Sequence, residues 1–426
     1  MSISHSIRNI LNIKDQRITF NENVTSHQLI GGVQSLVFNA TLAPHSPSFC
    51  PKCGCVNESF DIIKHGFKTI HIKLPRVSNQ RTFLFLKKQR YFCKHCSHTF
   101  TVSTDCVEDN HSISTNTYHS CILACKDKIS IKDIAKNHDI SHDRVNTWVG
   151  KLSNRFRVNK RSLPKHLCFD EFKSVRSVSA AMSFIFSDAQ THQVLDILQD
   201  RRLSYLKNYF WSYSEDARNH VETVCIDMYT PYIECIQACF PRAQIITDRF
   251  HVIQHISKGL SSTRIQMMKK HPKYYNKLKR YWKLILRNER HLDYQNHHSF
   301  ICFPYLMTQS QVVDEILRCD TELEESYYLY QKLINAYKDQ READFFNIVY
   351  EKHDGVSESM KKVLKTLIRH ERSIRNSMRY SFTNGPLEGT NNLIKVIKRI
   401  AFGYRDFYNF RSRILLISNT MVRLEQ

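Results

Sequence analysis

The order of strand-like and helix-like segments between residues 163 and 251 restricts the fold more than any other feature of this sequence. Short runs rich in β-branched and aromatic residues, separated by turn residues, predict three strands first: 166–171, 181–187 and 192–198. Helix and strand patterns then alternate: helix 203–211, strand 221–227, helix 229–240, strand 243–247 and a helix from 248. Such an order predicts an α/β domain.

Acidic residues stand at the ends of the first and the fourth of these strands. Asp170 and Glu171 end the first, and Asp227 ends the fourth. This order of elements, with Asp at those two places, is that of a ribonuclease-H-like domain, in which the two strand ends lie side by side. Because neighbouring residues of a strand face opposite sides, only one of Asp170 and Glu171 can join Asp227. Periodicity alone leaves that choice open.

A stretch near the C-terminus, 381–400, begins like a helix. Asn384 or Gly385 can cap it. Pro386 suits its first turn, and Gly403 is placed to end it. We therefore expect one regular helix after the long middle part of the chain.

The two faces of this helix differ in chemistry. At helical spacing the polar face carries Glu388, Asn392, Lys395 and Arg399. The apolar face, which should be buried, carries Leu387, Ile394, Ile397 and Ala401. A carboxylate with amides and cations below it can hold a metal ion while the cations hold phosphates. The alternative is a solvated amphipathic face with ordinary ion pairs.

Asp170, Asp227 and Glu388 together suit metal-assisted chemistry on phosphodiesters. Such chemistry needs an activated oxygen nucleophile and a stabilised leaving oxygen, and two Mg²⁺ ions held by a few carboxylates supply both. Mg²⁺ prefers carboxylate oxygen, water and phosphate, so we expect these acids to be catalytic and to bind Mg²⁺ or Mn²⁺. The alternatives are a helix cap for Asp227 and Asp248 and a surface charge for Glu388.

Four cysteines form two CxxC pairs, which predict a zinc site: Cys50 with Cys53, and Cys93 with Cys96. Each pair sets two thiolates on one side of a tetrahedral ion. Between the pairs lie two strand-like runs, 67–74 and 82–92. A β-ribbon closed by zinc at its base is the simplest picture. Cys55 and His95 are spare candidates, and the alternative is reduced structural or redox cysteines.

Residues 129–152 have the pattern of a helix-turn-helix. Ser130 and Ser141 can each cap a helix, and the turn lies at 138–140. The inward positions of the second helix are apolar: Val145, Trp148, Val149 and Leu152. Its outward positions suit the reading of a DNA groove: His142, Asp143, Arg144, Asn146, Thr147 and Lys151. The alternative is a generic helical hairpin.

Basic charge is dispersed along the chain rather than confined to a tail. Lys and Arg number 62 against 40 Asp and Glu, for a formal net charge of +22. Together with 20 Tyr and 25 Phe, this indicates folded domains whose surfaces face a polyanion. No stretch reaches the about 18 apolar residues of a membrane span, and the N-terminus does not resemble a signal peptide. We expect a soluble, cytoplasmic, nucleoid-associated bacterial protein that binds double-stranded DNA.

Residues 251–380 predict helices with few turn signals, between the last predicted strand and the helix that carries Glu388. The densest group of cations with interleaved aromatics runs from Lys269 to Lys283. We interpret the segment as a helical insertion that grips DNA. The alternative for the patch is a solvated helical face.

These patterns predict a multidomain chain: a zinc-binding β-ribbon, a helix-turn-helix, and an α/β ribonuclease-H-like domain with a large all-α insertion before its last helix. The expected boundaries are 1–45 for an N-terminal segment without an assigned function, 46–106 for the zinc-binding module, 107–160 for the helix-turn-helix, 161–250 and 381–426 for the two parts of the ribonuclease-H-like domain, and 251–380 for the insertion.

Longer motifs resemble those of the ISL3 family of insertion-sequence transposases, of the DDE class, and the resemblance covers nearly the whole chain. Besides the zinc and helix-turn-helix patterns, they are Phe169–Phe172, Ile226–Tyr232, Asp248–Val252, Gly385–Lys395 and Gly403–Arg411. The last two are long and specific.

The resemblance implies that Asp170, Asp227 and Glu388 are the catalytic triad. It also implies that the N-terminal modules bind terminal inverted repeats and that the insertion helps to hold the ends. Asp248 and His251 resemble a supporting motif with a structural or end-positioning role. The implied reaction is Mg²⁺-dependent cleavage at the element ends and joining of 3′ hydroxyls to target DNA. Joining two ends needs two sites, so we expect at least a homodimer on DNA.

Two other functions compete with this one. A regulator derived from a transposase would keep the zinc and helix-turn-helix modules and bind DNA without cutting it; the intact triad argues against it. A nuclease or resolvase of the same fold would act on branched DNA; the sequence-reading N-terminal modules argue against that.

Overall fold

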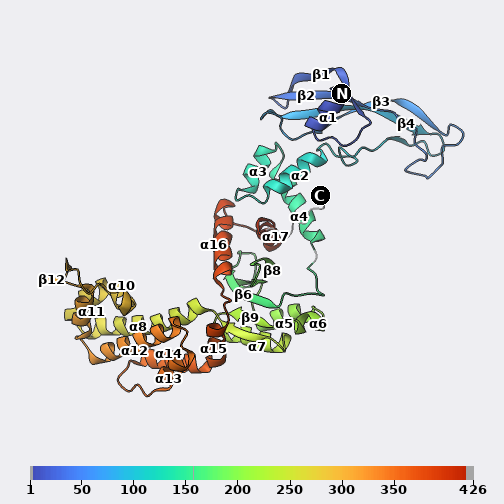
Figure 1. Cartoon of the computed structure of the whole chain (residues 1–426). Helices are drawn as coiled ribbons and strands as arrows, with labels where there is room; N and C mark the ends of the chain where they lie inside the picture. Colours follow the sequence, from blue (N-terminus) through green and yellow to red (C-terminus); the bar gives the residue numbers. More distant parts are fainter. Residues whose placement is uncertain (1–2, 157, 419–426) are drawn as a thin grey trace. The chain divides into compact units, whose positions relative to one another are not determined.

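The computed structural model describes residues 3–156 and 158–418, which fold as two compact units. Of these residues, the first unit contains 3–156 and 396–418, and the second contains 158–395. Helix α16 (Gly385–Ile400) runs from the second unit into the first. Each unit is described by itself below, with the labels of Figure 1.

A five-stranded sheet forms the N-terminal part of the first unit (blue in Figure 1). Its order is β1-β2-β4-β3 with β5 beside β4, and only β2 and β4 pair in parallel. The bounds are β1 Ile18–Ile30, β2 Val33–Leu42, β3 Ile62–Lys73, β4 Thr82–Cys93 and β5 Thr99–Thr101; α1 spans Ile3–Ile10. The predicted two-stranded ribbon is therefore too small. Residues 1–45, for which the sequence suggested no function, supply β1 and β2 and bury Phe38 and Leu42 against Leu84.

Three helices follow this sheet, and a fourth packs against them from the end of the chain: α2 Thr115–Ala124, α3 Ile131–Asn137, α4 His142–Arg155 and α17 Phe407–Ile417. The predicted caps are confirmed, because Ser130 Oγ accepts the N–H of Asp133 and Ser141 Oγ accepts the N–H of Arg144. The inward side chains predicted for α4 are buried, except that Leu152 is half-buried. Asp139, at φ 53°, turns the chain between α3 and α4.

A mixed five-stranded sheet is the centre of the second unit. Its order is β10-β9-β6-β7-β8, with β10, β9 and β6 parallel and β7 and β8 antiparallel. The strands are β6 His166–Lys173, β7 Met182–Asp188, β8 Val194–Leu198, β9 Thr223–Ile226 and β10 Gln244–Thr247; the helices are α5 Leu203–Trp211, α6 Glu215–Asn219 and α7 Thr230–Cys239. The types and order of the predicted elements are confirmed, and the short α6 is additional. On the core side Phe169 stacks on Phe210 and contacts Tyr232.

The rest of the second unit is mainly helical. Its α-helices are α8 Arg249–Lys270, α9 Tyr275–Arg280, α10 Trp282–Ile285, α11 Gln309–Leu317, α12 Thr321–Lys338, α13 Glu342–Tyr350, α14 Glu358–Arg369 and α15 Glu371–Arg379. Two 3₁₀ turns (Pro272–Tyr274, Glu289–His291) and a small hairpin (β11 His298–Ser299, β12 Leu306–Met307) were not predicted.

The long helix α8 organises this helical part, since both α12 and α14 pack on it. Gly259 permits the close approach of α14, because a Cβ there would lie 2.6 Å from Val363 Cγ2 and 2.9 Å from Met360 Sδ. At the far end of the segment α15 packs against the edge strand β10 and returns the chain to the sheet. Among the described residues no helix is both long and apolar enough to cross a membrane.

Candidate active site and zinc centre

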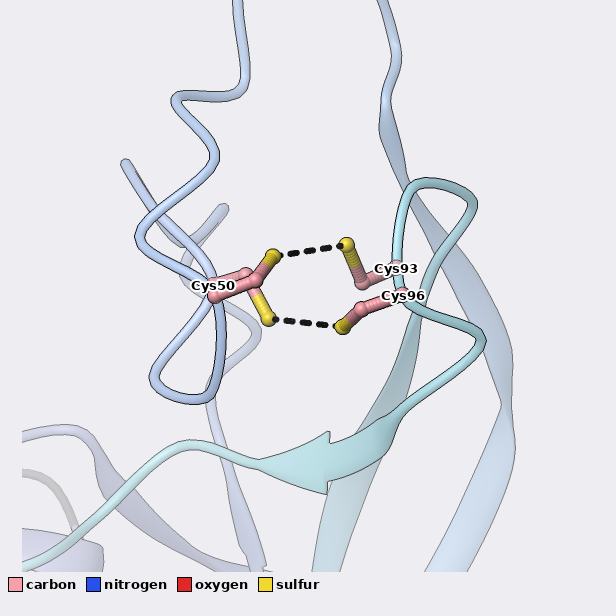
Figure 2. Close-up of side chains that lie close together, drawn as sticks. Cys50, Cys93 and Cys96 are labelled. Atoms are coloured by element: carbon pink, nitrogen blue, oxygen red, sulfur yellow. Dashed lines mark hydrogen bonds between the residues drawn. The ribbon is translucent and has the colours of Figure 1, made fainter.

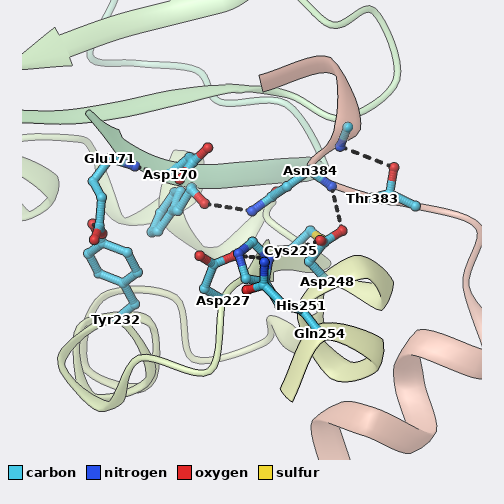
Figure 3. A network of polar contacts seen from close by, with 12 residues as sticks. Asp170, Glu171, Cys225, Asp227, Tyr232, Asp248, His251, Gln254, Thr383 and Asn384 are labelled. Carbon is cyan, nitrogen blue, oxygen red and sulfur yellow. Dashed lines mark hydrogen bonds and ion pairs between the residues drawn. The ribbon is translucent and has the colours of Figure 1, made fainter. Parts of the chain in front are cut away.

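Asp170 and Asp227 come from neighbouring strands. The parallel pairing of β6 and β9 runs to Cys168 opposite Cys225, and each Asp lies two residues beyond. The two carboxylates therefore stand side by side where the parallel pairing stops (Figure 3). The prediction that the first strand ends at its acids is wrong, because β6 continues to Lys173 by pairing with β7, with Asp170 opposite Ile185.

Asp170 and Glu171 face opposite sides of the sheet, as alternation requires. Glu171 shares the core face with Phe169. Its carboxylate accepts a hydrogen bond of 2.6 Å from Tyr232 Oη and forms an ion pair with Arg201. Asp170 lies on the other face, which it shares with Cys168, whose Sγ is 3.5 Å from the carbonyl oxygen of Thr383. The partners of Glu171 are thus internal, and Asp170 is the acid that faces the segment before α16.

Two asparagines attach α16 to this face of the sheet, and neither was predicted to be a site residue. Asn391 Nδ2 donates to Asp170 Oδ2 at 2.8 Å and to the carbonyl oxygen of Glu171 at 3.2 Å. Asn384 Nδ2 donates to the carbonyl oxygen of Phe169 at 2.9 Å. The helical spacing from Glu388 to Asn391 was the signal that would have identified Asn391.

Glu388 lies in the first turn of α16, and its side chain is exposed. Its backbone N–H donates to the carbonyl oxygen of Asn384 at 2.9 Å, so Asn384 stands at the cap position directly before the helix. Glu388 precedes Asn391 by three positions and shares a helix face with it. Within the described part of the chain, the cluster of ligand atoms near this place contains Asp227 but neither Asp170 nor Glu388.

That cluster consists of Asp227, Asp248 and His251, whose ligand atoms lie within 4.8 Å of one another (Figure 3). His251 Nδ1 is 2.8 Å from Asp227 Oδ1 and 3.1 Å from Asp248 Oδ2. Hydrogen bonds to Asp227 and then Asp248 raise the pKa of His251 to about 10, so the ring is cationic at neutral pH. Asp248 also accepts the backbone N–H of Asn384 at 2.9 Å. The motif thus holds both the Asp227 carboxylate and the start of α16.

Two observations test whether a divalent cation suits Asp170 and Asp227. Burial, followed by the charges of Asp227 and Glu171, raises the pKa of Asp170 to about 7. Asp227 Oδ1 is buried, and among the described residues its contact is with His251 Nδ1 at 2.8 Å. A crowded carboxylate gains from a hard cation, and a buried carboxylate oxygen with one partner can still accept one, so the residues fit Mg²⁺.

The four predicted zinc ligands meet in the first unit (Figure 2). Cys50 Sγ lies 3.6 Å from Cys96 Sγ, and Cys53 Sγ lies 3.8 Å from Cys93 Sγ. Zinc–sulfur bonds of about 2.3 Å place the sulfurs of a tetrahedral site about 3.8 Å apart, so the four cysteines are positioned for zinc.

The electrostatics of the cluster also favour a metal. Burial alone would raise the pKa of Cys50, but backbone N–H groups of Cys53 and Lys52 outweigh it and lower the pKa to about 6. A thiolate is the form that binds zinc. The spare candidates Cys55 and His95 are outside this cluster, and Cys55 Sγ instead contacts the carbonyl oxygen of Val56 at 3.5 Å.

The residues predicted to contact DNA lie mostly at the surface. On α4 the side chains of His142, Arg144, Thr147 and Lys151 are exposed, and Asn146 is half-buried. On α16 the exposed residues are Asn392, Lys395 and Arg399, opposite the buried Leu387, Ile394 and Ile397; Ala401, also predicted to be buried, is half-buried. In the helical part, Lys279 lies over the ring of Tyr275 and Lys283 over that of Trp282, and both rings are 41% exposed.

Comparisons with known proteins show which families the two parts of the chain resemble. An ISL3-type family model described as "Transposase" matches residues 167–414, and one described as the zinc-finger of transposases IS204/IS1001/IS1096/IS1165 matches residues 46–96. The chain is 25% identical over 337 residues to the transposase for insertion sequence element IS1001 of Bordetella parapertussis, across 76% of this chain and 79% of the relative.

A shorter match involves a protein of Lactococcus lactis subsp. lactis named ATP-dependent protease. It is 36% identical over 110 residues, which are 26% of this chain and 35% of that protein. The chain thus aligns with about a third of the length of this relative and with about four fifths of the other.

Proposed function

We propose that this chain, which belongs to the ISL3 family of transposases, cleaves DNA at the ends of an insertion sequence and joins the freed 3′ hydroxyls to target DNA. The observation that carries the proposal is the attachment of α16 to β6. Asn391 binds Asp170 beside Asp227, and Glu388 lies one turn earlier on the same helix. In this proposal, segments far apart in the sequence contribute the three acids to one site.

In this proposal Asp170, Asp227 and Glu388 are the catalytic residues and hold Mg²⁺ or Mn²⁺. When bound, the two ions activate the attacking oxygen and stabilise the leaving oxygen of the phosphodiester. Asp227 and Asp170 would supply oxygens from the strands, and Glu388 would supply the oxygens from the helix. Carboxylates from two rigid elements give the fixed geometry that such a site needs.

The neighbouring side chains have positioning roles. His251 stands between Asp227 and Asp248 and holds the Asp227 carboxylate in place. Asn391 orients Asp170 through its amide. Asp248 fixes the residue that precedes α16 by accepting the N–H of Asn384. We therefore assign Asp248 and His251 a supporting role.

We further propose that α3 and α4 form a helix-turn-helix that reads the terminal inverted repeats together with the zinc module. The outward residues of α4 would contact base edges, and the exposed amide and cations of α16 would contact phosphates. They are His142, Arg144, Asn146, Thr147 and Lys151 on α4, and Asn392, Lys395 and Arg399 on α16. Target DNA is the second nucleic-acid partner, and pairing of two ends would require at least a homodimer.

The mixed sheet of the second unit supports a ribonuclease-H-like assignment for residues 161–250. Its strands follow the order β10-β9-β6-β7-β8, so β6, the first strand of this domain in sequence order, lies beside β9, the fourth. The start of α16 would complete this domain as the first part of the proposed C-terminal segment 381–426, of which residues 396–418 pack in the first unit. The helical segment 251–380 would then be an insertion before the last helix, and residues 46–106 and 107–160 would be the zinc and helix-turn-helix modules.

The experiment compares the protein with its Glu388→Gln variant on a labelled duplex that carries the flanking inverted repeat, in Mg²⁺ or Mn²⁺. We expect metal-dependent cutting at the repeat end and its loss in the variant. Glu358→Gln is the matched control, because Glu358 is also an exposed glutamate in the first turn of a helix. Specific binding without cutting by any of the three proteins would instead favour a non-cutting regulator.

A further inference from the structure

Helix α16 ends in an unusual way at Phe402. The N–H of Phe402 donates to the carbonyl oxygen of Arg399 at 3.1 Å, and the N–H of Gly403 donates to that of Lys398 at 3.0 Å. These two bonds form a Schellman C-cap, in which the position of Phe402 is usually glycine because its backbone is left-handed. Phe402 has φ 52°, and its side chain is 100% exposed.

Phe402 therefore carries two unfavourable features at once. A bulky residue in the left-handed region is strained, and a fully exposed phenyl ring gains nothing from burial. The neighbouring aromatic residues behave differently, since Phe407 and Phe410 are buried and Tyr404 packs on Phe410 with ring centroids 4.9 Å apart. The loop is thus anchored by its other rings, and it presents Phe402 to solvent. Local strain of this kind points to a function outside the fold itself.

The residues around Phe402 indicate what kind of partner its ring binds. It lines a cavity of about 640 Å³ with residues from the starts of α3 and α4 and from the loop before α17. Lys132 and Arg405 supply cations, and His142 and Asn146 of α4 supply polar groups. The one carboxylate in this lining belongs to Asp406, which is engaged as a helix cap and accepts the N–H of Asn409 at 2.7 Å.

We infer that Phe402 stacks on a base of the bound DNA end, beside the first turn of α4. The inference rests on the proposed function, since it assigns a base contact to the same DNA. Double-stranded DNA can bind both the cations and the ring of this surface. Its phosphates pair with Lys132 and Arg405, and an unstacked base presents a flat face to the ring of Phe402. Apolar side chains inserted at a base step and aromatic rings stacked on bases are established modes of DNA binding. An apolar protein groove would leave Lys132 and Arg405 without anionic partners.

The test uses the full chain and a duplex of the element end with 2-aminopurine at successive positions near the tip. Phe402→Gly removes the ring and restores the residue that the C-cap favours, so we expect an unchanged or higher Tm. We also expect about tenfold weaker binding to the end and loss of the 2-aminopurine fluorescence that reports an unstacked base. Phe402→Trp should retain the affinity for the end, because an indole ring also stacks on a base.

Phe60→Gly is the matched control. Phe60 also has a left-handed backbone, at φ 61°, and an exposed ring, but Glu58 and Asp61 flank it. Its loss should leave affinity and fluorescence unchanged. Wild-type affinity and fluorescence in Phe402→Gly, or an equal loss in Phe60→Gly, would overturn the inference while the proposed function stands. A wild-type protein that does not prefer the element end over competitor duplex would overturn both.

Discussion

Asn391 and Asp170 are 221 residues apart in the sequence, and their side chains meet through a hydrogen bond of 2.8 Å from Nδ2 to Oδ2. The same amide also donates to the carbonyl oxygen of Glu171 at 3.2 Å. One side chain of α16 thus fixes both the carboxylate and the backbone of β6. Because Glu388 shares a helix face with Asn391, this contact determines how closely Glu388 can approach Asp170.

Replacement of Asn391 by Ala should slow cleavage about tenfold while the affinity for the element end changes less than twofold. The reason is that Asp170 loses the donor that orients it, although no DNA contact is removed. Asn392→Ala, at the exposed neighbouring position, should show the opposite: weaker binding and a cleavage rate at saturating DNA close to wild type. Filter binding and single-turnover cleavage separate the two. Equal cleavage by Asn391→Ala and wild type would show that the hydrogen bond has no role.

His251 predicts a pH dependence of stability. Its pKa is raised to about 10 in the folded state by Asp227 and Asp248, against about 6.5 in an unfolded chain. Its charge therefore stabilises the fold fully below about pH 6.5, and this stabilisation is lost as pH rises through about 10. We expect His251→Gln to lose about 1–2 kcal/mol at pH 6.5, a value discounted for solvent screening, and to approach wild type near pH 10.

The measurement is urea denaturation in EDTA at several pH values between about 6.5 and 10, the two pKa values above. His255→Gln is the control, because burial lowers the pKa of His255, whereas Asp227 and Asp248 raise that of His251. The difference between His255→Gln and wild type should therefore not vary with pH. A constant difference for His251→Gln would mean that its ion pairs contribute no stability.

The zinc centre predicts a selective defect. Cys53→Ser removes one of four ligands, and zinc content by atomic absorption should fall from about one equivalent towards zero. Binding to the element end should weaken, while the far-UV signal of the second unit persists. Cys55→Ser changes the cysteine two positions away that lies outside the cluster, and it should retain both zinc and affinity. Wild-type protein without stoichiometric zinc, or full affinity in Cys53→Ser, would contradict this.

Some of this architecture follows from local patterns, and some does not. The strands that lead to Asp170 and Asp227 are short, apolar and separated by turn residues, so the sequence predicts their order along the chain. The zinc ligands were also predictable, because the spacing of each CxxC pair is a local pattern. In contrast, β1 (Ile18–Ile30) is exposed along most of its length and has an irregular register between Phe20 and Thr25, so no clean alternation marks it. The parallel pairing of β2 with β4 joins distant segments, which periodicity does not report.

The second feature that the sequence does not predict is how a helix is rotated about its axis, which decides the side chains that face the sheet. The sequence placed Asn392 on the polar face of α16 with Glu388, yet Asn391 is the asparagine that reaches Asp170. Both lie within one turn of Glu388, and only the packing of the helix against the sheet distinguishes them. Similarly, Arg413 reads as a charged surface residue, but it is 1% exposed because three backbone carbonyls surround its guanidinium.

Arg413 should be necessary for the stability of the first unit. It donates to the carbonyl oxygens of Cys125, Asp127 and Ile129 in the loop between α2 and α3. Arg413→Ala leaves these acceptors unsatisfied and a cavity behind, so we expect a loss of about 3 kcal/mol or more in unfolding free energy. Arg144→Ala, an exposed arginine of the same unit, should bind DNA less tightly with an unchanged Tm. An unchanged Tm in Arg413→Ala would refute the assignment.

The cationic patch on the helical part makes a prediction about salt. Lys279 and Lys283 are exposed beside Tyr275 and Trp282. In such an arrangement the lysines can contact DNA phosphates and the aromatic rings can stack on bases. Each lysine that contacts a phosphate releases a counterion, so its removal reduces the slope of log K against log salt by about 0.9. Lys279→Gln should therefore lower the slope by about that amount and weaken binding to all duplexes similarly.

A suitable control for this measurement is Lys352→Gln. Lys352 is also exposed, but its ammonium is 2.8 Å from the carboxylate of Asp354, which already neutralises it. Binding isotherms from about 50 to 200 mM salt, with the element end and a scrambled duplex, give the slopes directly. A reduced slope in Lys279→Gln alone would assign the helical part to the DNA interface. Parallel lines for wild type and both variants would show that these helices are only a solvated face, because a phosphate contact cannot be removed without a change in counterion release.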